Sequence, residues 1–174
     1  MELVDKEECF EEIIKGETLE VLNVDKLNQL HPYISEIITY FLSKARNDRR
    51  PKRNDLVPSE VVHLIPYIAI LEPRYEGDEL LDLNVRLMGT EMVKLYGENT
   101  GKMLSDFTNK TVSKRVFETC DLVVKNKSIV VGTVSSFDKD RSYLKILKTM
   151  IPLFDDEHNP DRVTQIISLI VSGS

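Results

Sequence analysis

Three histidines and an acidic run are the side chains best suited to acid–base or metal chemistry in this chain. His31 precedes a proline, His63 lies in a predicted short helix, and His158 follows the acidic residues 155–157. Catalysis or metal binding requires such groups to meet within bonding distance. His63 has no histidine or carboxylate at ligand spacing along the sequence, and the run at 155–158 is typical of a polar turn. We therefore predict no catalytic residues and no metal site.

The cysteines and the known catalytic motifs lead to the same prediction. Cys9 and Cys120 lie in different predicted elements and form no CxxC pair, which indicates reduced thiols. The sequence contains no GxSxG, HExxH, Walker or GxGxxG motif. We predict that the protein is not an enzyme.

A basic run at residues 46–55, RNDRRPKRND, has two interpretations. Its cations could contact an anion or a nucleic acid, or it could be a solvated connector. Pro51 and the interspersed aspartates favour the connector. The net charge of −6 also argues against a broad nucleic-acid surface, because phosphate binding needs a positive field. We predict no nucleic-acid partner.

The composition is that of one globular domain. The 174 residues are 41% hydrophobic and 30% charged, which disfavours disorder over most of the length. The chain opens with no signal-peptide pattern, and no apolar run approaches the ~20 residues of a membrane helix. We expect a cytoplasmic protein with no membrane partner.

The clearest element is the stretch LDLNVRLMGTEMVKLYG at 81–97. Its first half alternates apolar and polar residues with a period of two, which predicts a strand with one buried face. Gly89 then permits a change of direction, Thr90 is a suitable N-cap, and Gly97 is placed to end a short helix. A strand that leads directly into a compact helix suggests an α+β domain.

The remaining elements follow from the same periodicities. They are helices at 34–46, 58–65 and 110–126, and strands at 67–75, 129–137, 143–154 and 162–172. Residues 18–24 could be a strand or a turn of helix. We divide the chain into an N-terminal extension at 1–33, an amphipathic helix within 34–48, and one domain at 49–174. The apolar stripe of helix 34–46 must pack on the domain or on a second copy.

Three segments resemble the PAS-domain superfamily, in particular its bacterial stand-alone branch. They are RRPKRNDLVPSEVVHLIPYIAILEP at 49–73, VRLMGTEMVKLYGENTGKMLSDF at 85–107, and LKTMIPLFDDEHNPDRVTQIISLIV at 147–171. The resemblance implies an α+β fold with a five-stranded antiparallel sheet in the order 2-1-5-4-3 and helices on one face. It also implies a homodimer through the helix that precedes the first strand, here 34–46.

The same resemblance implies a cavity between the helices and the sheet. The candidates for ligand binding there are Met92, Tyr96, Phe107, Phe117, Cys120 and Met150. Ordinary core packing is the more common reason for such residues, because methionine and aromatic side chains routinely fill cores. Haem-binding relatives use a histidine on the long helix, and 110–126 has none. Flavin photosensors use an Asn-Cys-Arg motif, whereas Cys120 lies in ETCDL. The identity of any cofactor stays unknown.

The leading hypothesis is a non-enzymatic sensory module for signal transduction. It would bind a small molecule in its core, form a homodimer, and signal through a separate partner protein. The alternative is a ligand-free adaptor for protein interaction, whose cavity is filled by its own side chains. A third hypothesis is DNA-linked regulation through Arg49–Arg53.

Overall fold

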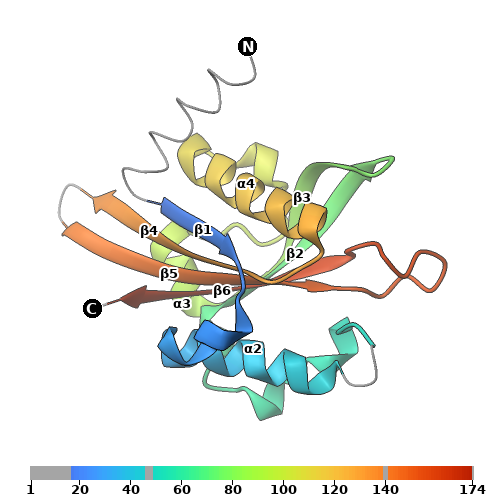
Figure 1. Cartoon of the computed structure of the whole chain (residues 1–174). Coiled ribbons are helices and arrows are strands. Elements are labelled where there is room, and N and C mark those ends of the chain that lie inside the picture. The colour runs from blue at the N-terminus through green and yellow to red at the C-terminus, as the bar shows by residue number, and fades with distance from the viewer. Residues whose placement is uncertain (1–16, 46–48, 139–140, 174) are drawn as a thin grey trace.

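The structure, a computed structural model, describes residues 17–45, 49–138 and 141–173 (Figure 1). Six strands form one antiparallel sheet, ordered β1-β4-β5-β6-β2-β3. The strands are β1 Glu17–Val21, β2 Ile68–Glu76, β3 Glu79–Met88, β4 Val130–Asp138, β5 Arg141–Leu153 and β6 Gln165–Gly173. The α-helices among the described residues are α2 Pro32–Lys44, α3 Thr90–Tyr96 and α4 Lys110–Asn126.

The sheet confirms the predicted strand order and adds one strand to it. The strands β3-β2-β6-β5-β4 follow the spatial order 2-1-5-4-3 of the five predicted strands. The sixth strand, β1, pairs antiparallel with β4, with Leu19 opposite Gly132. The prediction of five strands was therefore wrong. Residues 18–24 were ambiguous because seven residues carry little periodicity, and pairing with a distant strand decides the conformation of those in β1.

Helices cover both faces of the sheet, with α2 on one side and α4 on the other (Figure 1). The stripe of α2 packs with Ile70 and Ile167, whereas α4 packs with the adjacent residues Leu71 and Ile166. The predicted cover of one face by the short and long helices thus holds for α3 and α4, and α2, predicted as a separate N-terminal helix, covers the other face. The physical reason lies in β6, where residues of both parities, such as Ile166 and Ile167, are fully buried and need cover.

Helix α2 uses its apolar stripe inside the chain. It begins at Pro32, two residues before the predicted start, because the His31 ring accepts a hydrogen bond from the Tyr33 amide at 3.1 Å. Ile37, Ile38 and other stripe residues are buried against the chain's own sheet. The homodimer through this helix stays a prediction, but most of the stripe that motivated it is buried within the chain, with Leu42 exposed.

The strand–turn–helix stretch folds as predicted, with one difference at the glycine. Gly97 ends α3 with φ of 78°, and α4 has the predicted bounds. The N-cap of α3 is Gly89 rather than Thr90. Gly89 has φ of −68°, which any residue adopts, but a Cβ there would lie 2.3 Å from the Pro66 carbonyl oxygen. Close backbone packing therefore explains this glycine.

The predicted helix at 58–65 is replaced by two 3₁₀ turns, Pro58–Glu60 and Ile65–Tyr67. Val61 leaves the helical region with φ of −135°, and Pro66 has no N–H to donate to an α-helical turn. The loop after α3 lies along the outer edge of β3. The Val85 amide donates to Lys102 O at 2.9 Å, and the Asp82 carboxylate accepts from Ser105. This attachment holds Leu104 and Phe107 beneath α4.

Candidate functional site

An apolar cavity of about 40 Å³ lies between the sheet and helices α3 and α4. The sheet contributes residues from four strands, and these are Ala69, Leu71, Val85, Met150, Ser168 and Ile170. The helices and the loop before α4 contribute Met92, Tyr96, Leu104, Phe107, Val112 and Val116, and Met88 completes the lining from the end of β3. The cavity is therefore bordered by the elements that the strand–turn–helix stretch positions.

Two small side chains make this part of the sheet hollow. Ala69 on β2 is paired directly with Ser168 on β6, and Met150 on β5 is paired with Ser168 from the other side. Ala69 and Ser168 reach less far from the sheet than the methionine, leucine and isoleucine residues around them. The space left above this pair is the cavity.

The lining includes one residue whose buried polar group is unpaired, Ser168. Ser168 is 1% exposed, and its Oγ has no hydrogen-bond partner among the described residues. An unpaired buried hydroxyl costs roughly 1–3 kcal/mol. No residue in the lining carries an acidic or basic side chain. The site can hold a molecule by apolar contact and one hydrogen bond, and it offers no pair of groups for acid–base catalysis.

The structure brings together four of the six predicted ligand-binding residues. Met92, Tyr96, Phe107 and Met150 line the cavity, whereas Phe117 and Cys120 do not. On α4 the lining residues are Val112 and Val116, four positions apart on one face. Phe117 is turned ~100° from Val116 around the helix. It packs against the core beside the cavity.

Cys120 lies fully buried behind Met150. Its Sγ donates to Met150 Sδ at 3.4 Å. Burial raises the pKa of the Cys120 thiol to about 12, although nearby Lys148 acts in the opposite direction. The thiol is therefore protonated at neutral pH, which makes it a poor nucleophile. The structure supports an inert core thiol rather than a redox reporter.

Ser168 is the polar lining residue that the sequence prediction missed. Residues 165–171 read QIISLIV, and Ser168 is the one short polar side chain on the parity shared by Ile166 and Ile170. This break in an otherwise apolar face is a usable signal. The break at Ser168 can be recognised only if both faces of this strand are taken to be buried.

The cavity is too small for a flavin or a haem when the side chains have the conformations of this structure. A space of about 40 Å³ holds about three water molecules, far less than either ring system. The Cys120 thiol does not line it, and α4 carries no histidine. The residues present thus do not favour either cofactor.

The histidines and the acidic run have structural roles. His63 pairs with a carboxylate that is distant in the sequence, because its Nε2 lies 2.7 Å from Glu36 Oε1. Asp156 accepts hydrogen bonds from the backbone amides of His158 and Asn159, as expected for a turn. Among the described residues no group of three potential metal ligands occurs.

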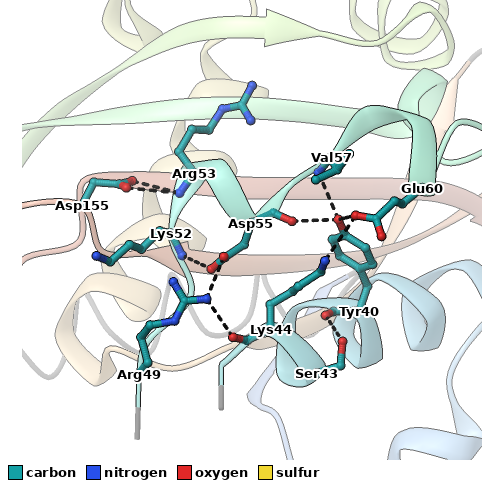
Figure 2. A network of polar contacts seen from close by, with 10 residues as sticks. All are labelled: Tyr40, Ser43, Lys44, Arg49, Lys52, Arg53, Asp55, Val57, Glu60 and Asp155. Atoms are coloured by element: carbon teal, nitrogen blue, oxygen red, sulfur yellow. Dashed lines mark hydrogen bonds and ion pairs between the residues drawn. The ribbon is translucent and has the colours of Figure 1, made fainter. Parts of the chain in front are cut away.

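The basic run joins the end of α2 to the β5–β6 hairpin (Figure 2). Arg49 pairs with Asp55 at 2.8 Å, and the Arg53 amide donates to the Asp155 carboxylate at 3.1 Å. Arg50 pairs with Asp161 at 2.9 Å and lies over the Phe154 ring. Since the guanidinium groups of Arg49 and Arg50 already contact acidic and aromatic groups of the same chain, the geometry supports the connector interpretation.

Comparison with known proteins decides the family. A family model described as a PAS domain matches residues 29–168. The chain belongs to the PAS-domain family. PAS domains are typically non-catalytic sensory modules, in agreement with a cavity that lacks catalytic groups. No curated protein matches this PAS chain.

Several solved structures are similar to this PAS domain at low sequence identity. An RNA-binding light-oxygen-voltage receptor is 14% identical with a TM-score of 0.43. The match covers 67% of this chain and 33% of the receptor, so the chain spans about a third of that protein.

Two fungal proteins match over more of their length. A fungal LOV-domain photoreceptor is 15% identical, with 82% and 94% of the two chains covered and a TM-score of 0.41. A cysteine-to-valine variant of the fungal photoreceptor VVD is 14% identical, with 82% and 97% covered and a TM-score of 0.40. Within the described part of this chain, no helix is both long and apolar enough to cross a membrane.

Proposed function

We propose that this PAS domain is a sensory module that binds a small molecule in the cavity beneath α3 and α4. One observation carries the proposal. The cavity lining includes Ser168, whose hydroxyl is buried and lacks a partner among the described residues. Buried polar groups in native proteins are nearly always paired, so an unpaired one beside a cavity favours a bound molecule.

The signal would leave through a partner protein, because the cavity itself offers no chemistry. The elements above the cavity are α3, a helix of seven residues, and α4, whose residues Val112 and Val116 would contact the ligand. A ligand that separates these helices from the sheet would change the outer surface available to the partner. A homodimeric state and a bacterial cytoplasmic setting are parts of the same proposal.

The alternative function is a ligand-free adaptor, and the small cavity volume of about 40 Å³ favours it. Native mass spectrometry with an absorption spectrum of the freshly purified protein distinguishes the two. A discrete extra mass on each chain supports the sensor. Chains at the bare sequence mass, with no small molecule bound on titration, support the adaptor. The same spectrum gives the subunit count, and light scattering at several concentrations tests the homodimer.

A further inference from the structure

The residues that line the cavity limit which ligands it can bind. This inference rests on the proposed function. We propose that the ligand is a small uncharged molecule with an apolar body and one hydrogen-bonding group, such as an alcohol, an aldehyde or a ketone. Its polar group pairs with the hydroxyl of Ser168, and its body lies among the methionine side chains.

The absence of charge follows from the lining. No lining residue is acidic or basic, and a buried charge without a partner is strongly unfavourable. Among the described residues the buried cation is Lys148, which is not a lining residue. Its Nζ donates to Thr119 Oγ1 at 3.0 Å between β5 and α4. A carboxylate or an ammonium ligand would therefore lose its hydration without a compensating ion pair.

The single polar group follows from the position of Ser168. This residue lies at the centre of the sheet, between Ala69 and Met150, and its Oγ is without a partner in the described chain. Tyr96 also carries a hydroxyl, but it is half-buried at the α3 end of the cavity. A serine hydroxyl both donates and accepts, so it pairs with a carbonyl or with another hydroxyl.

The size follows from the volume and from the flexible lining. About 40 Å³ corresponds to about three water molecules. Met88, Met92 and Met150 border this space, and methionine adapts to the shape of its neighbours because it is unbranched. Rearranged methionines extend the space to a ligand of about five heavy atoms.

The experiment uses the full chain with ¹³C-labelled methionine methyl groups and four probes of similar size. The probes are 1-butanol, pentane, butanoate and butylammonium. Met88, Met92 and Met150 report on the cavity, and Met103, which lies outside the lining, is the internal control. We expect 1-butanol to shift the three cavity methyl signals saturably and to leave Met103 unchanged. We expect no saturable shift from butanoate or butylammonium.

Two variants test the role of the hydroxyl. Ser168→Ala should weaken 1-butanol binding roughly three- to tenfold and leave pentane binding unchanged, since pentane makes no hydrogen bond. Ser113→Ala is the matched control, because this hydroxyl lies on α4 and donates to Lys110 O at 3.1 Å. It should leave 1-butanol binding unchanged.

The possible failures are distinguishable. Butanoate or butylammonium binding as tightly as 1-butanol overturns the uncharged class while the site stands. Equal 1-butanol affinity in Ser168→Ala and in the original protein overturns the anchoring role of the hydroxyl. If none of the four probes, pentane included, shifts the cavity methyl groups, the cavity does not admit small molecules and the proposed function itself fails.

Discussion

Ala69 and Ser168 face each other across the β2–β6 ladder, and both side chains line the same cavity. Few positions in the centre of a packed sheet carry two short side chains together, because interiors are close-packed. The pair leaves a space that larger residues would fill. It therefore gives a direct test of whether the cavity exists in the folded protein.

Ala69→Val should stabilise the ligand-free protein by up to about 1 kcal/mol, because the two added methyl groups enter existing space. The matched change in the opposite direction, Ala69→Gly, should destabilise it by about 1 kcal/mol. Urea unfolding of both variants gives the change in free energy. A loss of 1 kcal/mol or more for Ala69→Val would mean that the space is already occupied by packed atoms.

Ser168→Ala should raise the stability of the ligand-free protein by about 1 kcal/mol. The substitution removes a buried hydroxyl that has no partner among the described residues, so no hydrogen bond is lost. Thr149→Val is the control, because this buried hydroxyl donates to Val130 O at 3.0 Å. It should cost about 1 kcal/mol in the same urea experiment. Equal losses for both variants would show that Ser168 is hydrogen-bonded.

Helices and strands with a clear periodicity could be predicted from the sequence alone. The alternation at 81–88 and the stripe of α4 gave the correct elements, since each is encoded by neighbouring residues. The cavity lining was predicted for residues such as Met92 and Met150, which are long and apolar. Phe117 was predicted to line the cavity but does not, because a shift of one position on a helix turns a side chain by ~100°.

Features that depend on pairing between distant segments could not be predicted in this way. The strand β1 exists because β4 pairs with it, and α2 covers a second sheet face that only the assembled sheet presents. Ser168 was missed for the same reason. Its importance comes from Ala69, a residue roughly 100 positions away that packs beside it in the sheet.

The stability of the protein should fall as the pH rises from about 9 towards 12. The Cys120 thiol has an ordinary pKa near 9.0, which burial raises to about 12 in the folded chain. Over this window the unfolded chain releases the proton while the folded chain keeps it, so ionisation favours unfolding. Burial also raises the pKa of Tyr75 to about 12, which acts in the same direction.

Cys120→Ala separates the two contributions. In a Cys9→Ala background, the variant should lose less stability between pH 9 and 11 than its parent, because the contribution of the Cys120 thiol is removed. Urea unfolding across this range gives the two slopes. Parallel slopes would contradict the buried position of the thiol, and so would rapid reaction of native Cys120 with a thiol reagent at pH 8.

Tyr40→Phe should cost about 1–2 kcal/mol and loosen the connector after α2 (Figure 2). The Tyr40 hydroxyl accepts from the Val57 amide at 3.0 Å and lies 2.7 Å from Asp55 O, so its removal leaves both backbone groups without this partner. Tyr33→Phe is the control, because its hydroxyl has no hydrogen bond within the described chain. Amide exchange at Val57 should quicken only in Tyr40→Phe, and equal exchange in both variants would contradict this role.

Gly89→Ala should destabilise the protein by about 3 kcal/mol or more, although its backbone angles suit any residue. The added Cβ would lie 2.3 Å from Pro66 O and 2.5 Å from Ile65 O, and both are backbone atoms that a rotamer change does not move. Either the turn Ile65–Tyr67 or the start of α3 must shift, and the latter displaces Met92 in the cavity. Gly101→Ala is the control, since its φ of 85° costs about 1 kcal/mol but no atom lies within 4 Å of the new Cβ. Urea unfolding and the Met92 methyl signal report the two effects. A Gly89→Ala variant no less stable than Gly101→Ala would show that the close approach of Gly89 to Pro66 is absent in solution.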